Sequence, residues 1–572
     1  MAAHPNPNKL FYGDNLHVLR EQIADESVDL IYLDPPFNSK RDYNLLFKTP
    51  KKPAKASASS KPAPTADEPE ADTPYSDAQI TAFEDTWHWN DTAEREFGEI
   101  IKCGNTDVSE LMQALRAFLK ENDMLAYLTM MCNRLLELHR VLKPTGSLYL
   151  HCDPTASHYL KLVLDGVFGK EYFRNEIVWR RSGAHNDSKR YGANHDVIFF
   201  YSMSNRWTWN PQFTSYSEQY VEQNYRYRDE SGRRFRVSDM TANKPGGDVS
   251  YDWTTPDGQT VKPYKGRYWA YSKANMQKMD QNGLIYYRTT GMPMLKHYLD
   301  EMPGVPLQTF WEEPLAIISG SAERLGYPTQ KPLALLERII SASSNEGDVV
   351  LDPFCGCGTA VHAAEKLGRR WVGIDITHLS IGLIERRMKD AFPALREKGV
   401  FEVIGTPQDL GAASDLAERD KYQFQSWACM LVGAQLYKRG KKGADGGVDG
   451  LLWIETERSK TEKVIVQVKG GGHGGRAAIA TLIGDVSREK AAIGLFITLI
   501  KPTREMVTEA AAAGLYESPH HGTFPKIQIL TIEGLLSKSE RPQFPDMSCG
   551  GQTLKQAKKE NKSALGKQAK LI

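Results

Sequence analysis

A strand, a glycine turn and a helix in succession constrain this chain more than any other feature. The apolar run Val349–Leu351 leads into the loop 352–358, and a helical pattern follows from Thr359. A second apolar strand, Arg370–Ile374, comes next. A strand–helix–strand run of this kind predicts a βαβ unit, and such a unit requires a parallel sheet with helices on its faces. The sequence therefore predicts an α/β fold.

The loop after the first strand reads Asp352-Pro353-Phe354-Cys355-Gly356-Cys357-Gly358. Gly356 and Gly358 lack a Cβ atom, so the backbone can approach a ligand closely, and the following helix offers free N–H groups at its N-terminus. Asp375 follows the glycines by about 20 residues, a spacing at which an acid reaches a ribose diol. These features favour a nucleoside cofactor over a plain strand-to-helix turn. NAD and ATP are weaker choices because neither G-x-G-x-x-G nor G-x-x-x-x-G-K-[ST] occurs here.

A second motif, Asp34-Pro35-Pro36-Phe37, follows the apolar strand Leu30–Leu33. Proline fixes φ and removes the N–H donor, so the motif presents the Asp34 carboxylate, the proline carbonyls and the Phe37 ring rigidly at the carboxyl end of a strand. Open α/β sheets bind their ligands at that end. A carboxylate with carbonyl acceptors suits an exocyclic amine, and an aromatic face suits a planar base. Taken alone, the tetrapeptide could also be an ordinary loop.

Together these motifs resemble the β-class amino-group DNA methyltransferases. Asp34-Pro35-Pro36-Phe37 is similar to their D-P-P-[YFW] catalytic motif, and the loop 352–358 is similar to their D-P-F-x-G-[ST]-G cofactor loop, with Cys357 where Ser or Thr is usual. Residues 327–332 resemble the H-P-[TA]-Q-K-P segment that precedes this loop. The catalytic motif comes before the cofactor loop, which is the β-class order. Residues 8–44 look especially like the modification subunits of type III restriction systems.

The resemblance implies a Rossmann-like, S-adenosylmethionine-dependent methyltransferase domain that methylates the exocyclic amine of a base flipped out of double-stranded DNA. It implies catalytic roles for Asp34, Pro35, Pro36 and Phe37, with Asp34 and the Pro35 carbonyl on the amine and Phe37 stacked on the base. The residues expected to bind the cofactor are Asp14, Asn15, Thr329, Gln330, Lys331, Asp352, Phe354, Gly356, Gly358, Thr359 and Asp375. In this family Asp-Pro-Pro-Phe goes more often with adenine N6 and Ser-Pro-Pro with cytosine N4, so adenine is the expected base.

Towards the C-terminus, Asp449 closes a glycine-rich segment and is followed by Gln467 and Lys469 on the next predicted strand. Strand alternation places Gln467 and Lys469 on one face. Asp449 with an amide or carbonyl oxygen can hold Mg²⁺, and a lysine can activate water for phosphodiester attack. A charged surface hairpin is the alternative. Residues 420–540 resemble the Mrr-like restriction endonucleases of the PD-(D/E)xK superfamily, whose catalytic positions match Asp449, Gln467 and Lys469. An acid that this family often carries on its first helix is Gln425 here.

Changes in composition divide the chain. We expect a methyltransferase domain at 1–405, a linker at 406–419, an Mrr-like endonuclease domain at 420–540 and a Lys-rich tail at 541–572. Within the first domain, the Pro-, Ala- and Ser-rich segment 49–75 reads as a flexible insert. The stretch 202–312 interleaves aromatic residues with Lys and Arg, which suits base stacking and phosphate contacts, and such enzymes keep target recognition there. A solvated, loop-rich subdomain is the alternative.

The charge balance excludes a uniformly basic protein, because 72 Lys and Arg against 71 Asp and Glu give a formal net charge of +1. A contact with DNA must therefore be a local patch. The 7 cysteines include no C-x-x-C pair, which fits reduced thiols in a cytosol rather than a zinc ribbon. We read no secretory signal and no apolar run that could span a bilayer, so a cytoplasmic protein without membrane contact is expected.

These observations leave competing hypotheses. The first is a restriction–modification or phage-defence protein whose C-terminal domain cuts DNA with Mg²⁺. The second is a solitary N6-adenine or N4-cytosine methylase whose C-terminal domain only binds DNA. An RNA or protein methyltransferase is disfavoured by the insert and the nuclease-like domain. The resemblance also implies a homodimer and a separate restriction or translocase subunit. Because the chain shows no ATPase motif, a translocase would be a separate subunit.

Overall fold

The computed structural model describes most of the chain. The described residues are 7–36, 42–47, 78–84, 87–183, 189, 191–243, 249–318, 321, 323–325, 327, 329–396, 400–437, 447–457, 460–472, 474–518, 522–544 and 560. Phe37, the predicted insert 49–75 and nearly all of the predicted tail lie outside them. The chain forms two compact units, one comprising 1–210 with 309–565 and the other centred on 211–308. No helix in the described part of the chain is long and apolar enough to cross a membrane.

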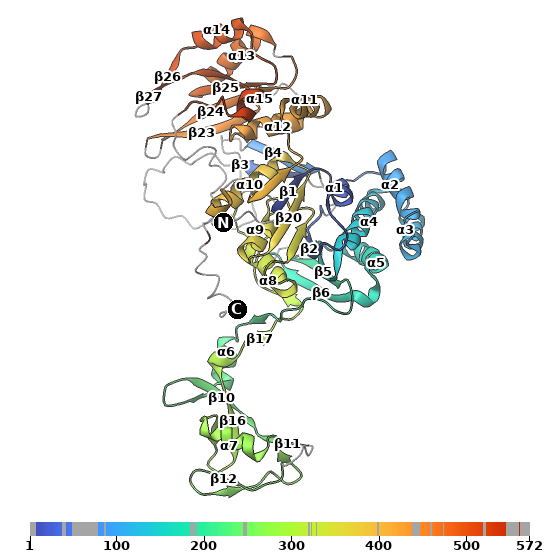
Figure 1. The fold of residues 1–572 in the computed structure, drawn as a ribbon, viewed down its shortest axis with the longest axis vertical. Helices are drawn as coiled ribbons and strands as arrows, with labels where there is room; N and C mark the ends of the chain where they lie inside the picture. Colours follow the sequence, from blue (N-terminus) through green and yellow to red (C-terminus); the bar gives the residue numbers. More distant parts are fainter. Residues whose placement is uncertain are drawn as a thin grey trace. The chain divides into compact units, whose positions relative to one another are not determined.

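A nine-stranded sheet, in the order β18-β6-β7-β5-β2-β19-β20-β1-β21, is the framework of the first unit (Figure 1). Only β7 runs antiparallel to its neighbours, β5 and β6. The strands are β1 (Asn8–Tyr12), β2 (Val28–Leu33), β5 (Leu142–Cys152), β6 (Phe173–Arg180), β7 (His195–Ser202), β18 (Phe310–Trp311), β19 (Val349–Asp352), β20 (Arg370–Asp375) and β21 (Phe401–Ile404). A largely parallel sheet confirms the predicted Rossmann-like fold. The sheet also makes β2 and β19 parallel neighbours. The two sequence motifs follow these strands, so both lie at the carboxyl ends of the strands.

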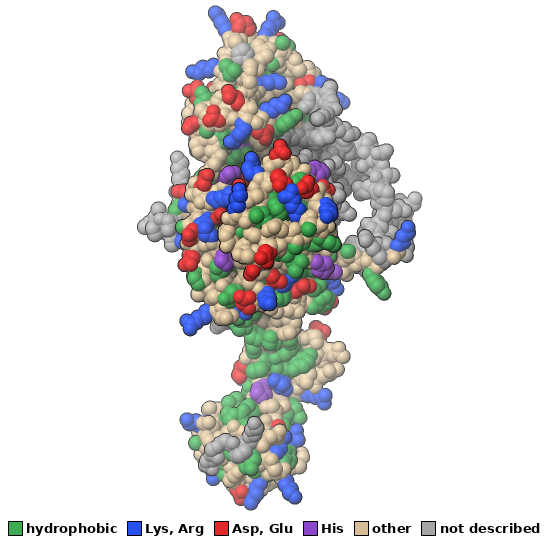
Figure 2. Space-filling view, turned by 90° about the vertical axis from the view of Figure 1, so that its right-hand side faces the viewer, with side chains coloured by type: hydrophobic (Ala, Val, Ile, Leu, Met, Phe, Trp, Pro, Cys, Tyr) green, Lys and Arg blue, Asp and Glu red, His purple; other side chains and the backbone are tan. Residues whose placement is uncertain are grey.

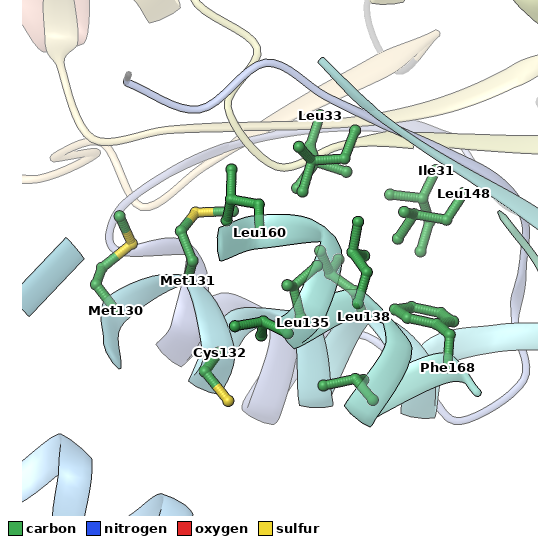
Figure 3. Close-up of a cluster of buried hydrophobic side chains, with 14 of the residues drawn as sticks. Ile31, Leu33, Met130, Met131, Cys132, Leu135, Leu138, Leu148, Leu160 and Phe168 are labelled. Atoms are coloured by element: carbon green, nitrogen blue, oxygen red, sulfur yellow. The ribbon is translucent and has the colours of Figure 1, made fainter. Parts of the chain in front are cut away.

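Helices cover this sheet on both faces. They are α1 (Asn15–Gln22), α2 (Asp91–Ile101), α3 (Thr106–Leu119), α4 (Asp123–Val141), α5 (Ser157–Phe168), α8 (Leu333–Ser343), α9 (Thr359–Lys366) and α10 (His378–Ala391). Figure 3 shows apolar side chains of α4 and α5 pointing toward Ile31, Leu33 and Leu148 of the sheet. Because side chains alternate along a strand, burying Ile31 and Leu33 on that face turns Tyr32 and Asp34 to the other.

The C-terminal part of the first unit has its own five-stranded sheet, in the order β22-β23-β24-β25-β28. Its elements are α11 (Leu410–Arg419), α12 (Lys421–Leu431), β22 (Gln435–Leu436), β23 (Gly450–Glu457), β24 (Lys460–Lys469), α13 (Gly475–Arg488), β25 (Ile493–Thr498), α14 (Arg504–Ala512), β26 (Leu515–Ser518), β27 (Gly522–Pro525), β28 (Ile527–Thr531) and α15 (Ile532–Ser537). Helix α11 occupies most of the segment 406–419 that was predicted to be a linker. Ala413 and Leu416 are buried in the core of this sheet, so the segment packs as part of the domain.

The second unit contains short strands around an aromatic core. Its elements are β8 (Phe213–Thr214), α6 (Glu218–Asn224), β9 (Tyr227–Arg228), β10 (Arg234–Asp239), β11 (Thr241–Ala242), β12 (Trp253–Thr254), β13 (Thr260–Val261), β14 (Tyr268–Trp269), α7 (Lys273–Gln281), β15 (Ile285–Tyr287), β16 (Pro293–Tyr298) and β17 (Val305–Pro306). Trp253, Trp269 and Met276 are buried together. The role of this region in target recognition stays a prediction. Figure 2 shows Lys and Arg interspersed with Asp and Glu over much of the visible face.

A further pair of strands, β3 (Asp42–Phe47) and β4 (Ala78–Glu84), is antiparallel and flanks the predicted insert.

Candidate functional site

The glycine loop is shaped by two left-handed residues. Gly356 has φ +50° and Gly358 has φ +73°, and Gly358 is the N-cap of α9. A Cβ on Gly358 would lie 2.8 Å from Cγ1 of Ile384, and one on Gly356 would lie 3.3 Å from Cε1 of Tyr327. Backbone conformation and close packing therefore both favour glycine here. The turn leaves the first N–H groups of α9 at the end of β19, where an anionic or polar ligand group can accept from them.

Asp375 ties this loop to the neighbouring strand β20. Its Oδ2 accepts a hydrogen bond from Gly356 N at 3.0 Å, and its Oδ1 accepts from Thr377 N at 2.9 Å. Asp352, at the end of β19, accepts from Phe354 N at 3.0 Å. Burial raises the pKa of Asp375 and raises that of Asp352 well above its ordinary value. The two carboxylates thus hold the loop in shape and line its edge.

Asp14 and Asn15 lie at the start of α1, directly after the strand β1 that pairs with β20. Asp14 caps the helix by accepting from Leu16 N at 2.9 Å, and Asn15 donates to the Pro353 carbonyl at 2.9 Å. Both side chains also accept from Arg134, at 2.9 Å for Asp14 Oδ2 and 2.5 Å for Asn15 Oδ1. The sequence did not lead us to expect Arg134 at this site. It could have been found because it is a cation on the buried face of the helix 123–141, and a buried cation needs a partner.

Asp34 at the end of β2 faces Lys331. The Nζ atom of Lys331 donates to Asp34 Oδ2 at 2.5 Å, and the two side chains are only 11% and 15% exposed. Asp34 Oδ1 is buried and has no hydrogen-bond partner among the described residues. One oxygen of the carboxylate therefore forms an ion pair with Lys331, while the other can accept a hydrogen bond from a ligand.

A row of buried, hydrogen-bonded polar groups contacts β2 through Tyr32, near Asp34. The Tyr32 hydroxyl lies 3.0 Å from His151 Nδ1, His151 Nε2 lies 3.1 Å from Asp196 Oδ2, and Arg181 donates to Asp196 Oδ1 at 2.9 Å. Burial alone would raise the pKa of Asp196, but the hydrogen bond to His151 and the nearby cations lower it below its ordinary value. Tyr32 is fixed by these contacts, and its ring forms part of the wall beside Asp34.

These groups surround a cavity with an empty volume of about 1200 Å³, counting space open to solvent. Most of the predicted residues line it, namely Asp14, Asn15, Asp34, Pro35, Pro36, Thr329, Lys331, Asp352, Phe354, Gly356, Thr359 and Asp375. Gly358 supports the wall from behind as the N-cap of α9. Trp87, Met130 and Tyr327 also line the cavity and were not predicted to do so.

Gln330 departs from the expectation. Its side chain accepts from Leu325 N and donates to the Glu323 carbonyl, each at 2.8 Å, and it does not line the cavity. The amide is thus used to close the loop that carries Thr329 and Lys331. Phe37 lies outside the described residues.

The predicted nuclease residues lie at one edge of the second sheet. Asp449 directly precedes β23 and accepts from Val468 N at 2.7 Å through Oδ2. Gln467 on β24 is 3% exposed, and its Oε1 has no partner among the described residues. Val464, Val466 and Val468 belong to one core cluster and Ile465 to another, so alternation places Gln467 and Lys469 on the face of Ile465, which α13 covers.

The methylase-like part of the chain can now be compared with known proteins. Residues 28–386 match the model of a family described as DNA methylase. The chain belongs to this DNA methylase family. Residues 416–517 match a second family, described as restriction endonuclease, so the methylase carries a C-terminal Mrr-like domain.

Curated relatives come from restriction–modification systems. The methylase is similar to the type II methyltransferase M.EcaI of Enterobacter cloacae, at 34% identity over 44% of this chain and 54% of that protein. It is also similar to the Mod subunit of the type III restriction-modification enzyme StyLTI of Salmonella typhimurium, at 28% identity over 64% of this chain and 51% of that protein. DNA adenine methyltransferase YhdJ of Escherichia coli is 41% identical over 19% of this chain and 34% of its own length. The chain thus spans about half the length of the first two relatives.

Proposed function

We propose that this DNA methylase transfers a methyl group from S-adenosylmethionine to adenine N6 of a base flipped out of duplex DNA. The observation that carries the proposal is Asp34, which lines the cavity beside the glycine loop and whose buried Oδ1 has no hydrogen-bond partner among the described residues. Adenine is supported by the resemblance of Asp34-Pro35-Pro36-Phe37 to adenine-type motifs and by the adenine-specific name of one relative. Cytosine N4 is the alternative.

The cavity suits the proposed cofactor. Asp375 can hold a ribose hydroxyl, and Asp14 and Asn15, which follow the neighbouring strand β1 and also line the cavity, can contact the adenine ring. We expect Thr329 and Lys331 to contact the methionine end. When bound, S-adenosylmethionine supplies an electrophilic methyl group on a good leaving group.

Asp34 and Pro35 would act on the base. An exocyclic amine is a poor nucleophile because its lone pair is delocalised into the ring. Accepting hydrogen bonds at Asp34 Oδ1 and the Pro35 carbonyl draws the nitrogen toward tetrahedral geometry and stabilises the positive charge that develops on it. Lys331 orients Asp34 through the 2.5 Å contact with Oδ2. Alignment of amine and methyl group supplies much of the remaining acceleration.

Single-molecule sequencing of DNA from cells that express the wild type or an Asp34→Ala variant tests the proposal. We expect a methylated adenine motif with the wild type only. With purified protein, Asp34→Asn should lower the methylation rate by roughly 100- to 1,000-fold while the cofactor still binds, since one preorganised partner of the developing charge is weakened. N4-methylcytosine in the motif would overturn the choice of base. Absence of any modified base from a folded, cofactor-binding wild type would overturn DNA methylation itself.

We propose as a second function that the Mrr-like domain cleaves DNA with a divalent cation. The favouring observation is the buried amide oxygen of Gln467, which has no partner within the described part of the chain and lies on the same sheet face as Lys469. Asp449 and Gln467 fit a hard cation through their oxygens. Supercoiled DNA carrying the unmethylated motif should be cut by the wild type with Mg²⁺ and left intact by Lys469→Met. A wild type that binds this DNA without cutting would favour a DNA-binding domain. The homodimer, a separate restriction subunit and a cytoplasmic location stay predictions.

A further inference from the structure

A row of hydrogen-bonded side chains crosses the sheet from the cofactor cavity to the surface. Tyr32 lines the cavity, and its hydroxyl oxygen lies 3.0 Å from His151 Nδ1. His151 Nε2 lies 3.1 Å from Asp196 Oδ2, and both of these side chains are fully buried. Arg181 donates to Asp196 Oδ1 at 2.9 Å, and the Arg181 side chain is 42% exposed. The row therefore connects the cavity wall to the surface through two buried groups.

The pairing of the strands sets the order of this row. Its first three members belong to β2, β5 and β7, which are neighbours in the sheet. Tyr32 pairs in register with Tyr149, and His151 pairs with Ile198, two residues after Asp196. Because side chains alternate along a strand, Tyr32, His151 and Asp196 all lie on the face opposite α4 and α5.

The direction of the hydrogen bonds follows from the charge on Asp196. Its ion pair with Arg181 favours the ionised carboxylate, which can only accept hydrogen bonds. His151 Nε2 must therefore carry a proton, and in the neutral ring Nδ1 then has a lone pair to which the Tyr32 hydroxyl donates. The order of hydroxyl, imidazole and carboxylate is the one in which a base takes a proton through a hydroxyl group.

Methylation of an exocyclic amine releases a proton that the site must accept. When the amine nitrogen bonds to the methyl carbon, the C–S bond breaks, its electron pair stays on sulfur, and the positive charge moves to the nitrogen. One N–H bond must then break. Asp34 is a poor acceptor for this proton, because protonation would weaken its largely buried ion pair with Lys331.

We infer that Tyr32 and His151 form a relay that takes the proton from the amine, with Asp196 as the residue that positions His151. The amine proton passes to the Tyr32 oxygen while the hydroxyl proton of Tyr32 passes to His151 Nδ1. The positive charge then lies on the imidazole ring beside Asp196. Burial, together with the negative charge of Asp34, raises the pKa of Tyr32 well above its ordinary value. The relay agrees with this, because Tyr32 gives up one proton as it gains another and never becomes a phenolate.

This inference deepens the proposed methyl transfer and rests on it, but the proton positions can be measured without any reaction. We would label the histidine rings of the full-length chain with ¹⁵N and record the ring signals by nuclear magnetic resonance. The His151 signals are those missing from His151→Gln. We expect the proton on Nε2 in the wild type. In Asp196→Asn it should move to Nδ1, because Arg181 holds the amide oxygen and the NH₂ group then donates to Nε2.

The transfer itself is tested by single-turnover methylation, with S-adenosylmethionine, of a duplex that carries the motif found by sequencing. Tyr32→Phe removes only the hydroxyl group, and we expect it to slow methylation roughly 100-fold, as loss of a general base does. Its affinities for S-adenosylmethionine and for the duplex should stay at the wild-type values. The wild type should react more slowly in deuterated water, and this isotope effect should be absent from Tyr32→Phe.

Tyr149→Phe is the matched control. It removes a buried tyrosine hydroxyl from the neighbouring strand, where that group lies 2.7 Å from Ser343 Oγ, and Tyr149 does not line the cavity. We expect this variant to keep both the wild-type rate and the isotope effect. Circular dichroism and S-adenosylmethionine binding would show that each variant folds.

The outcomes separate the relay from the methyl transfer. A wild-type His151 ring with a proton on Nδ1 would overturn the relay, whether or not the protein methylates DNA. If Tyr32→Phe is slow but keeps the isotope effect, the hydroxyl has a structural role and the relay is wrong. If Tyr32→Phe matches the wild type in rate, the relay is wrong and the proposed methyl transfer stands. A folded wild type that methylates no base overturns both.

Discussion

In the cofactor cavity the buried carboxylates of Asp352 and Asp375 each accept hydrogen bonds from backbone N–H groups of the loop they border. At the nuclease edge, Gln467 Oε1 and Oδ2 of Asp485, a buried residue of α13, accept none among the described residues. Both regions place polar groups at the carboxyl ends of sheet strands. In the cavity, backbone N–H groups donate to the buried carboxylates. At the nuclease edge, the two side-chain oxygens have no donor among the described residues.

The difference teaches what each ligand must contribute. The loop of the cavity is held by backbone hydrogen bonds, so its shape does not depend on a bound ligand. The side-chain oxygens at the nuclease edge have no such contacts among the described residues. We therefore expect the cavity to be sensitive to backbone changes and the nuclease edge to be sensitive to changes of single oxygen atoms.

The largest expected effect comes from Gly358→Ala. Both Gly358 and Gly368 have φ +73°, and they lie at the two ends of the same helix, α9. Either substitution should cost about 1–2 kcal/mol of stability from left-handed strain alone. At Gly358 the new Cβ would also press on Ile384, which is fully buried, whereas at Gly368 it would meet Glu346 at 3.1 Å.

Titration of each variant with S-adenosylmethionine by calorimetry checks this contrast. Because the clash displaces the helix N-terminus that forms the cavity wall, Gly358→Ala should weaken binding more than about tenfold, which is roughly 1.4 kcal/mol. Gly368→Ala should bind like the wild type. Equal losses in both would show that helix stability, rather than loop shape, determines affinity.

Much of the cavity could be predicted because its residues lie in two contiguous motifs at strand ends. A parallel sheet brings such ends together whatever lies between them. The pairing of Asp34 with Lys331 was not predicted, because Lys331 lies in the loop before α8 rather than at a strand end. Arg134 could not be placed, since its contacts with Asp14 and Asn15 depend on how α4 packs on α1. Gln330 was expected at the ligand because its motif was read as a unit, whereas the backbone groups of its own loop needed the amide.

The same reasoning explains the misses in the C-terminal domain. Asp485 carries no motif, and only the packing of α13 on β24 brings it to Gly447. The segment 406–419 looked like a linker because α11 is short and its buried face consists of small and isolated residues such as Ala413 and Leu416. The position of α11 is determined by its packing against the core of the five-stranded sheet, and not by a periodic pattern in its own sequence.

His378, in the methylase part of the chain, is an exception to this comparison. It is buried, and its ring nitrogens have no hydrogen-bond partner among the described residues. It begins α10 next to the cavity residue Thr377, its ring stacks on Tyr12 with centroids 3.7 Å apart, and neither ring nitrogen has a partner among the described residues. Burial lowers the pKa of His378 to about 3. The ring is thus neutral in the folded state near pH 7.

A depressed histidine pKa stabilises the fold above the unfolded pKa of about 6.5, and that stability is lost as the pH falls toward 3. Between pH 7 and pH 5 the loss attributable to His378 should be about 2 kcal/mol. Urea unfolding across this range should therefore be less pH-dependent in His378→Gln than in the wild type. His17→Gln, which changes an exposed histidine, serves as the control. Parallel pH profiles for all three proteins would show that His378 is protonated without penalty.

The smallest expected effect concerns Cys357, where the cofactor loop departs from the usual Ser or Thr. The side chain is 4% exposed and its Sγ lies 3.5 Å from Thr359 Oγ1, while its carbonyl accepts from Arg387 Nη1 at 3.0 Å. If the cavity recognises its ligand through backbone and shape, the identity of this side chain matters little. Cys357→Ser should change the cofactor dissociation constant by less than about threefold, since a single neutral hydrogen bond contributes roughly 0.5–1.5 kcal/mol and here is exchanged for a similar one.

Burial also raises the pKa of the Cys357 thiol, so it stays protonated and should react with iodoacetamide more slowly than the exposed Cys103. A tenfold loss of cofactor affinity in Cys357→Ser would place side-chain chemistry inside the loop and remove the distinction between a backbone-built cavity and a side-chain-built cation site.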